Sequence, residues 1–392
     1  MKIAIDARFI NPENRGLSTY TRNLVSGLAE IDHKNQYYIL LRQKDYTSMR
    51  FRNANFHKVK AETHWYGIKE QILIPKILYS IKPDLTHFPH FNLPIIYNRP
   101  FITTIHDLIL FAFPTKRATR LGRASYFIKE KAYRHTINHA VKKAKAIISV
   151  SQSTCADIQK YFPKIPANKI HTIYEGAGGE NDNKIKQFEN VSSQVRKNWL
   201  KRKEHVRFPF VFYLGGAYPH KNLERLAFAW NGARKNIKEK TKQDFYLVIA
   251  GGEDYFFKRL KSLVIQSKIK NITFPGFVSD RKTLEYLYQE ALFCIFPSLY
   301  EGFGLPPLEA LKRKKLVLCN NGTCFPEILG DSVVYFDGCS VTSLSDAIVN
   351  TVENLDNLKK EYLPKAKETL QKYSWTKMVK ETLKLYQSVG QK

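Results

Sequence analysis

Cysteine is scarce in this sequence and follows no recognisable pattern. Only five of the 392 residues are cysteines, an odd number, and no two of them have the Cys-x2-Cys spacing. These features argue against a disulfide framework and a cysteine-based zinc site, and they predict a reducing compartment. Cys294 and Cys319 lie in apolar runs and are expected to be small buried hydrophobic residues.

Long apolar segments are also missing. No stretch approaches the roughly 20 uninterrupted apolar residues that a membrane-spanning helix needs. The first residues, Met1–Asp6, are expected to form a strand, because this segment is too short and too acidic at its end for a signal peptide. The sequence therefore predicts a cytoplasmic protein without a transmembrane helix.

Acidic residues are few compared with basic ones. The chain has 35 Asp and Glu against 63 Lys and Arg, which gives a formal net charge of +28. Such an excess predicts contact with polyanions, namely nucleic acid, anionic lipid headgroups or phosphate-bearing substrates. Many of the lysines are scattered, so part of the excess reflects composition alone.

One basic cluster is denser. Between Lys116 and Lys145 the chain carries ten Lys or Arg and one acidic residue, Glu130, with aromatic residues such as Tyr126 and Tyr133 between them. Two interpretations stay open, an amphipathic helix lying on an anionic membrane surface and an ordinary solvated helix face.

A length of 392 residues exceeds what one hydrophobic core usually supports, so two domains are expected. Apolar strand patterns alternate with helical patterns in both halves, which predicts two α/β domains with doubly wound parallel sheets. The expected strands are Lys2–Asp6, Tyr37–Leu41, Ile102–Thr104, Ala146–Val150, Ile170–Ile173, Phe210–Leu214, Tyr246–Ala250, Ile272–Pro275, Phe293–Phe296, Leu316–Cys319 and Val333–Phe336. The expected divisions are a Rossmann-like domain at 1–180, a linker at 181–207, a second Rossmann-like domain at 208–372 and a terminal helix at 373–392.

A motif in the second half combines a strand, a glycine-bearing loop and a helix. Glu301 and Glu309 flank the loop, and Gly302 and Gly304 allow a tight turn close to a ligand. Backbone N–H groups at such a helix start suit a phosphate. The two carboxylates suit the hydroxyl groups of two different sugar rings. An ordinary strand-to-helix turn is the alternative.

The Glu301–Glu309 motif and several other segments resemble the retaining, nucleotide-sugar-dependent glycosyltransferases of family 4. The other segments occur in the same order and spacing as in that family; they are Asp6-Ala7-Arg8 with Gly16–Leu24, His87-Phe88-Pro89, Thr104–Leu108, Ile148–Ser151, Leu214-Gly215-Gly216 with Pro219–Asn222, Gly276–Asp280 and Pro326–Asp331. The resemblance runs from Lys2 to about Gln387 and is closest to bacterial polysaccharide mannosyltransferases.

The resemblance implies the two-domain GT-B fold, with an N-terminal acceptor domain, a C-terminal donor domain and a last helix that crosses back. It implies transfer of a hexosyl unit from a nucleotide-diphosphate sugar to a surface polysaccharide or lipid-linked glycan. The loop before Lys221 favours GDP-mannose as donor. Configuration would be retained by a front-face mechanism. No cofactor is expected, and the absence of any Asp-x-Asp motif favours a metal-independent enzyme. We expect it at the cytoplasmic face of an anionic membrane, without nucleic acid.

The resemblance also implies a set of site residues. Lys221 would bind the diphosphate, His106 would touch the transferred sugar, Glu301 would bind sugar hydroxyls and Glu309 the ribose. The remaining substrate-binding positions are Gly16, Gly216, Phe277, Val278, Phe303, Gly304 and Leu305. Gly216 stands where the family usually has an arginine, so that contact is either missing or supplied by His220.

Two other classes of protein stay possible at this point. A different GT-B activity, such as a phosphorylase or a nucleotide-sugar epimerase, would share the fold and change the chemistry. A basic nucleic-acid-binding protein would explain the charge, but no nucleic-acid-binding module is recognisable.

Overall fold

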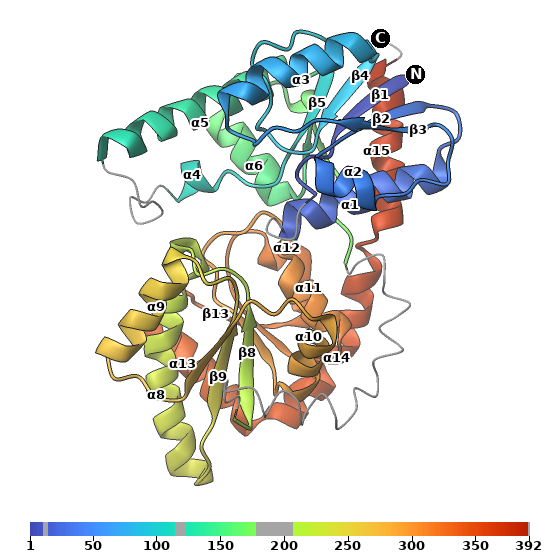
Figure 1. Ribbon diagram of the computed structural model, residues 1–392. Helices are drawn as coiled ribbons and strands as arrows, with labels where there is room; N and C mark the ends of the chain where they lie inside the picture. Colours follow the sequence, from blue (N-terminus) through green and yellow to red (C-terminus); the bar gives the residue numbers. More distant parts are fainter. Residues whose placement is uncertain (11–14, 114–122, 178–206, 391–392) are drawn as a thin grey trace. The chain divides into compact units, whose positions relative to one another are not determined.

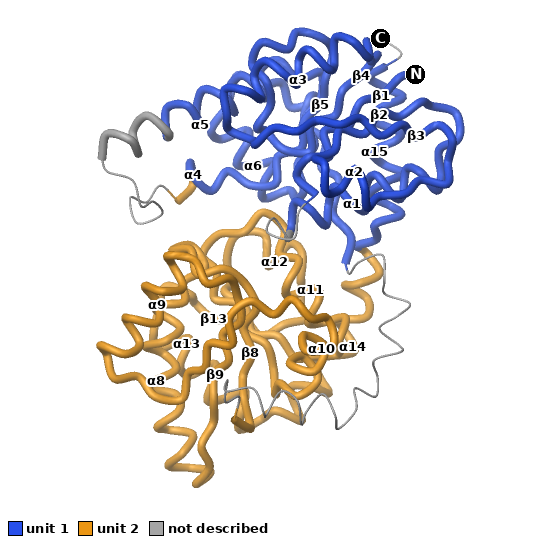
Figure 2. Tube along the Cα trace, viewed as in Figure 1, with its two compact units in different colours: residues 1–111, 121–179, 373–392 blue, residues 112–120, 180–372 orange. Residues whose placement is uncertain are grey.

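The computed structural model describes residues 1–10, 15–113, 123–177 and 207–390, without the side chains of Arg15 and of residues 123–129. The chain forms two compact units (Figure 2). Unit 1 comprises Met1–Phe111, Leu121–Gly179 and Tyr373–Lys392, and unit 2 comprises Ala112–Arg120 and Glu180–Lys372. The C-terminal segment thus belongs with the N-terminal part of the chain.

Unit 1 is built on a seven-stranded sheet in which all paired strands are parallel. The order is β3-β2-β1-β4-β5-β6-β7, so the direction of winding reverses between β1 and β4. The strands are β1 Lys2–Asp6, β2 Gln36–Leu41, β3 Phe56–Lys60, β4 Leu85–Phe88, β5 Phe101–Ile105, β6 Ala146–Ser149 and β7 Ile170–Thr172.

Helices cover both faces of this sheet (Figure 1). Each face has its own buried core. One core includes residues of α1 and α15, and the other includes residues of α3, α5 and α6. The helices are α1 Arg15–Ile31, α2 Gln43–Ser48, α3 Ile68–Ile81, α4 Ile109–Ala112, α5 Arg123–Lys143, α6 Gln152–Tyr161, the 3-10 turn η2 Ala167–Lys169 and α15 Trp375–Gly390.

The last helix, α15, is a full part of unit 1. Met378, Val379 and Tyr386 are buried in the same core as α1. A Cβ added at Gly27 of α1 would lie 2.6 Å from a methyl carbon of Val379, so α1 and α15 approach closely where a glycine permits it. The hydroxyl of Tyr386 lies 2.6 Å from Nδ1 of His87 in β4.

Unit 2 contains a six-stranded sheet with the order β10-β9-β8-β11-β12-β13, again parallel, and here the winding reverses between β8 and β11. The strands are β8 Phe210–Leu214, β9 Tyr246–Ala250, β10 Ile272–Gly276, β11 Cys294–Phe296, β12 Val317–Asn320 and β13 Val334–Phe336. The helical elements are η4 Pro219–Lys221, α8 Leu223–Thr241, α9 Tyr255–Gln266, α10 Arg281–Glu290, α11 Leu305–Lys312, α12 Phe325–Leu329, η5 Gly330–Ser332, α13 Val341–Glu353 and α14 Leu355–Gln371.

Local signals account for most of these elements. The strands predicted from apolar runs are confirmed to within one or two residues. Ser151, Asp254, Asp280 and Ser340 each cap a helix by accepting hydrogen bonds from backbone N–H groups of its first turn.

Two strands escape prediction for a physical reason. β4 carries Thr86 and His87, which are polar yet fully buried, and β3 is a polar edge strand, Phe56–Lys60. Hydrogen bonds between Thr86 and Tyr97 and between His87 and Thr104 satisfy these buried groups of β4. Burial of polar side chains therefore breaks the apolar pattern by which a strand is normally recognised.

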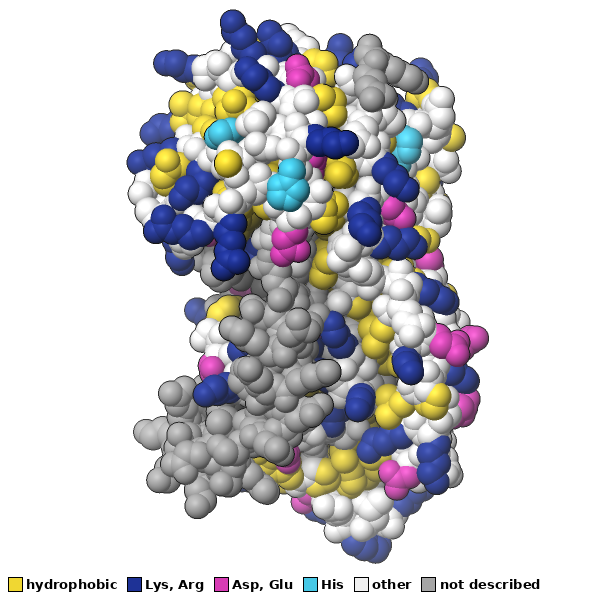
Figure 3. Space-filling model, turned by 90° about the vertical axis from the view of Figure 1, so that its right-hand side faces the viewer, with side chains coloured by type: hydrophobic (Ala, Val, Ile, Leu, Met, Phe, Trp, Pro, Cys, Tyr) yellow, Lys and Arg dark blue, Asp and Glu magenta, His cyan; other side chains and the backbone are white. Residues whose placement is uncertain are grey.

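The basic cluster between Lys116 and Lys145 falls partly outside the described residues, which omit 114–122. In the described part of α5, Lys131, Arg134, Lys142 and Lys143 are exposed, whereas Ile137 is buried in the core. On the face drawn in Figure 3, Lys and Arg side chains are scattered over both units. Among the described residues no helix is long and apolar enough to cross a membrane.

Candidate active site

Unit 2 brings two predicted residues together at the point where its winding reverses. In doubly wound sheets, ligands bind beyond the carboxyl ends of the strands at this position. Lys221 follows β8 and Glu301 follows β11, and Nζ of Lys221 lies 2.6 Å from Oε1 of Glu301. Their side chains are 20% and 17% exposed, so the ion pair is accessible to a ligand.

The loop after β8 is tied to its neighbours by Asn222. This residue has left-handed backbone angles, φ 62° and ψ 26°, and its Nδ2 donates to the carbonyl oxygens of Pro297 at 3.1 Å and Gly338 at 2.7 Å. The backbone N–H of Leu299 donates to the carbonyl of His220 at 2.7 Å. These bonds hold Lys221 in register with the loop that carries Glu301.

Electrostatics at this site favour a carboxylate and a single cation. Burial would raise the pKa of Glu301, but the positive charge of Lys221 together with hydrogen bonds from Lys221 and Ser298 outweighs it, and the pKa is lowered. Burial and the neighbouring Lys221 lower the pKa of His220 to about 3. His220 is therefore neutral, and it does not supply the positive charge that the family's arginine would bring.

The glycines before Lys221 have different roles. A Cβ at Gly215 would lie 2.5 Å from the hydroxyl oxygen of Tyr213, whereas a Cβ at Gly216 would lie 3.2 Å from the ring of Tyr218. The Tyr213 hydroxyl donates to the carbonyl of Gly216 at 2.8 Å. Packing thus requires glycine more strictly at Gly215 than at Gly216. Gly216 is the one of the two that was predicted to bind substrate.

The predicted loop after β11 turns into α11 as expected. Gly304 has φ +93°, a conformation that favours glycine, and precedes the first helical residue, Leu305. Pro306 and Pro307 have no N–H group, so any anion at this helix start would meet the N–H groups that precede them. Phe303 is 4% exposed, and its ring belongs to the core.

The remaining predicted positions of unit 2 lie within α11 and directly after β10. Glu309 is half-buried on α11. The hydrogen bond of Arg313 with Glu285 raises the pKa of Arg313 against the effect of burial, and the charge of Glu309 adds to this. Phe277, 48% exposed, and Val278, 9% exposed, follow β10. β9 separates β10 from β8 in the sheet.

His106 lies in unit 1, directly after β5, with both ring nitrogens next to protein oxygens. Nδ1 is 3.0 Å from Oε1 of Glu175 and Nε2 is 2.9 Å from the carbonyl oxygen of Pro89. Burial would lower the pKa of His106, but the hydrogen bond and charge of Glu175 outweigh it and raise the pKa. The carbonyl oxygen of His106 accepts a hydrogen bond from Thr154 Oγ1 at 3.3 Å.

The prediction that Gly16 lies on the loop after β1 is wrong. The helix α1 begins at Arg15, so Gly16 is already in its first turn. An added Cβ at Gly16 would meet no atom of the described residues within 4 Å, so packing among those residues does not require glycine here. Sequence alone places a helix start only to within a few residues, because first-turn residues make no intrahelical N–H bonds.

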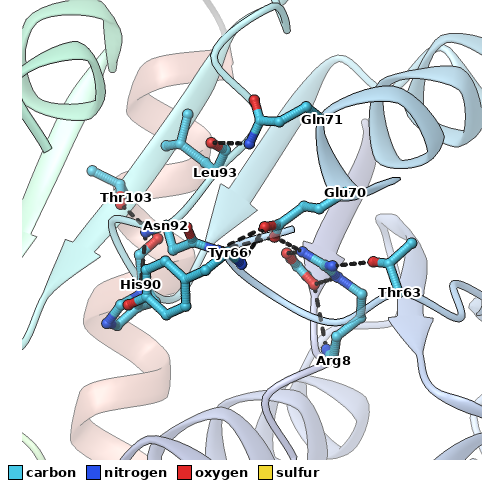
Figure 4. Close-up of polar contacts among 10 residues, drawn as sticks. Arg8, Thr63, Tyr66, Glu70, Gln71, His90, Asn92, Leu93 and Thr103 are labelled. Carbon is cyan, nitrogen blue, oxygen red and sulfur yellow. Dashed lines mark hydrogen bonds and ion pairs between the residues drawn. The ribbon is translucent and has the colours of Figure 1, made fainter. Parts of the chain in front are cut away.

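Sequence reasoning missed a buried charge network in unit 1 (Figure 4). Arg8 donates to both carboxylate oxygens of Asp6, at 2.7 and 2.6 Å, and to Glu70 at 2.7 Å. All three side chains are at most 1% exposed. The tripeptide Asp6-Ala7-Arg8 was the available signal, since a charged pair directly after an apolar strand calls for a partner.

Metal ligands do not gather in the described part of the chain. No group of three or more His, Cys, Asp or Glu side chains is placed there to hold a metal ion.

Comparison with known proteins gives two matching family models. Residues 14–177 match Glycosyltransferase Family 4, and residues 195–369 match Glycosyl transferases group 1. The O-antigen chain mannosyltransferase B of Escherichia coli is 26% identical over 310 residues, covering 79% of this chain and 75% of that protein. The O-antigen chain mannosyltransferase RfbU of Salmonella typhimurium is 25% identical over 287 residues, covering 73% and 70%.

A solved structure establishes the fold. Anabaena HepE in complex with UDP-glucose superposes with a TM-score of 0.71 over 99% of this chain and 100% of that one, at 15% sequence identity. The prediction of a GT-B fold is confirmed.

Proposed function

Because the chain belongs to the glycosyltransferases of family 4, we propose that it transfers a mannosyl unit from GDP-mannose to a growing surface polysaccharide or its lipid-linked precursor. The donor proposal is supported by the two O-antigen mannosyltransferases that the chain resembles. UDP-glucose, the ligand of HepE, is the competing donor to be tested.

The observation that carries the proposal is the accessible ion pair between Lys221 and Glu301. A lysine ammonium has three donors, and in the described residues Glu301 takes one of those of Lys221. The others are available to a diphosphate. Positive charge next to the leaving diphosphate stabilises the charge that develops there in the transition state.

Glu301 and Glu309 divide the recognition of the donor in this proposal. The lowered pKa of Glu301 keeps it a carboxylate, which accepts hydrogen bonds from sugar hydroxyls. Glu309, one helical turn after the start of α11 at Leu305, binds the ribose. Phe303, Gly304 and Leu305 offer backbone N–H groups, and Phe277 and Val278 line the base.

The reaction proceeds with retention and without a metal ion in this proposal. Both ring nitrogens of His106 lie beside oxygens and its pKa is raised, so a protonated His106 has no lone pair for the acceptor's proton. The leaving phosphate takes that proton instead, in a front-face mechanism. Because no metal takes part in this proposal, EDTA should leave the activity unchanged. If EDTA abolished the activity and magnesium restored it, the enzyme would depend on a metal ion.

The enzyme works at the cytoplasmic face of the membrane in this proposal. The exposed Lys142 and Lys143 of α5 contribute to the basic cluster, and each basic residue near an anionic surface is worth about 1 kcal/mol. We expect the protein to sediment with vesicles that contain anionic lipid and not with neutral vesicles, and we expect salt to release it. Equal sedimentation with both kinds would contradict an electrostatic attachment.

A donor panel tests the proposed activity. Purified protein is incubated with radiolabelled GDP-mannose, UDP-glucose or UDP-N-acetylglucosamine and a mannose oligosaccharide, and the product is separated and digested with α- and β-mannosidase. We expect transfer from GDP-mannose and cleavage by α-mannosidase. In parallel, GDP is expected to raise the melting temperature, since a ligand that binds the folded state stabilises it. Transfer from a UDP-sugar alone would overturn the donor assignment.

A further inference from the structure

Tyr66 combines an exposed ring with an unfavourable backbone. It follows β3 in unit 1, its side chain is 61% exposed, and its φ is +64°. A bulky residue at positive φ is a genuine outlier, and such residues persist only where their surroundings hold them. An exposed ring gains little from burial, so packing does not explain why a tyrosine is placed here.

The surroundings that hold Tyr66 are the buried charge network (Figure 4). The backbone N–H of Tyr66 donates to Oε2 of Glu70 at 2.8 Å. Glu70 is fully buried, and it accepts from Arg8 at 2.7 Å and from Asn92 at 3.0 Å. A saturated set of buried charges thus supports one exposed aromatic residue.

His90 lies beside Tyr66, and its ring nitrogen Nε2 carries a hydrogen-bond donor. Nδ1 of His90 accepts from the backbone N–H of Asn92 at 3.1 Å, which leaves the proton on Nε2. Burial and the neighbouring His106 lower the pKa of His90 to about 3, so the ring is neutral. Nothing among the described residues accepts a hydrogen bond from Nε2. The rings of His90 and Tyr66 are edge-to-face, with centroids 6.4 Å apart.

Trp65 extends this aromatic surface. Its half-buried ring stacks on Phe9, which follows β1, at a centroid distance of 4.9 Å. Phe9 also contacts the ring of His90, 5.2 Å away. The rings therefore gather beyond the carboxyl ends of β1, β3 and β4, which include the two strands where the winding of unit 1 reverses.

We propose that Tyr66, Trp65 and His90 form a binding platform for one hexose ring of a neutral glycan. This proposal rests on the proposed function in that the glycan is the acceptor. The C–H face of a pyranose packs on an aromatic ring, and the Nε2–H of His90 donates to a hydroxyl group. Few polar donors within an apolar surface are typical of small-molecule sites. The buried network beneath the surface sets one cation, Arg8, against two carboxylates, Asp6 and Glu70, so it offers no positive charge to an anionic ligand and favours an uncharged sugar.

Saturation-transfer NMR of the full chain with α-linked mannotriose tests the platform directly. We expect transfer to the sugar protons in the wild type and its loss in Tyr66→Gly. Glycine is at ease at positive φ, so the melting temperature of this variant should stay equal or rise. Tyr66→Phe should retain the signal. Tyr79→Ala, which removes a 40% exposed tyrosine of the same unit, is the matched control.

Enzyme kinetics adds a second readout. Tyr66→Gly and His90→Gln should each raise the KM for mannotriose at least tenfold and leave the KM for GDP-mannose unchanged. Undiminished NMR signal in Tyr66→Gly, an equal loss in Tyr79→Ala, or no signal in the wild type would overturn the platform. If no donor supports transfer but the signal still depends on Tyr66, the proposed function fails and the platform stands.

Discussion

Both units place charged side chains near the carboxyl end of a strand at which the winding reverses, β1 in unit 1 and β8 in unit 2, but they bury these charges to different degrees. In unit 1, Arg8, Asp6 and Glu70 are at most 1% exposed and bond one another. In unit 2, Lys221 and Glu301 are 20% and 17% exposed and make one ion pair. The groups of the buried network already bond one another, whereas the partly exposed pair of Lys221 and Glu301 keeps further donors and acceptors for a ligand.

The difference separates two uses of charge at equivalent places in a sheet. Removing one partner of a buried ion pair leaves an uncompensated charge and costs about 3–5 kcal/mol of stability. A more accessible pair contributes less to stability, and its charge is available to stabilise a ligand. We therefore expect substitutions in unit 1 to affect folding and substitutions in unit 2 to affect activity.

The largest expected effect is on stability in unit 1. Arg8→Met should lower the free energy of unfolding by about 3–5 kcal/mol, because Asp6 and Glu70 lose their cation. Urea unfolding followed by circular dichroism measures this. The control is Arg134→Met, which breaks an exposed pair with Glu130 and should cost less than about 1 kcal/mol. Similar losses in both variants would show that the buried network carries no special stability.

The next effect is on turnover in unit 2. Lys221→Ala should lower kcat by about a hundredfold, the usual cost of removing a group that stabilises developing charge. Its unfolding free energy should change by less than in Arg8→Met. Lys238→Ala removes an exposed lysine paired with Asp244 and is the matched control. A Lys221→Ala enzyme with normal kcat would remove the diphosphate role from this residue.

A smaller effect separates the two glutamates of unit 2. Glu309→Ala should weaken nucleotide binding, and Glu301→Ala should mainly reduce kcat by misplacing the sugar. Each loses charged hydrogen bonds worth about 1.5–3 kcal/mol, so changes of about tenfold or more are expected. Calorimetric titration with GDP and steady-state kinetics distinguish the two. If both substitutions weaken GDP binding equally, the two carboxylates do not bind different parts of the donor.

The smallest effect is a pH dependence in unit 1. The pKa of His106 is raised above 6.5 in the folded state, with Glu175 outweighing burial. Its stabilisation is therefore complete below pH 6.5 and is lost as the pH rises through the folded-state value. Glu175→Gln should destabilise the protein by about 1 kcal/mol at pH 6 and by less at pH 9. Equal destabilisation at both pH values would indicate a neutral His106.

Much of the fold could be predicted because the signals are local. Apolar runs such as Phe210–Leu214 predict buried parallel strands. Asp254 and Asp280 indicate helix starts, because their side chains can accept hydrogen bonds from backbone N–H groups of the first turn. β4 could not be predicted, since its buried Thr86 and His87 depend on partners such as Tyr97 and Thr104 elsewhere in the chain.

The candidate site divides along the same line. The turn between Glu301 and Glu309 could be predicted from the sequence, because glycine and proline set the local backbone conformation there through their own geometry. The contact of Lys221 with Glu301, 80 residues away, and the hydrogen bonds that Glu70 accepts from Arg8 and Tyr66 became visible in the folded chain alone. Such contacts depend on which strands become neighbours in a sheet, and strand order is a property of the whole chain's packing and of no local segment.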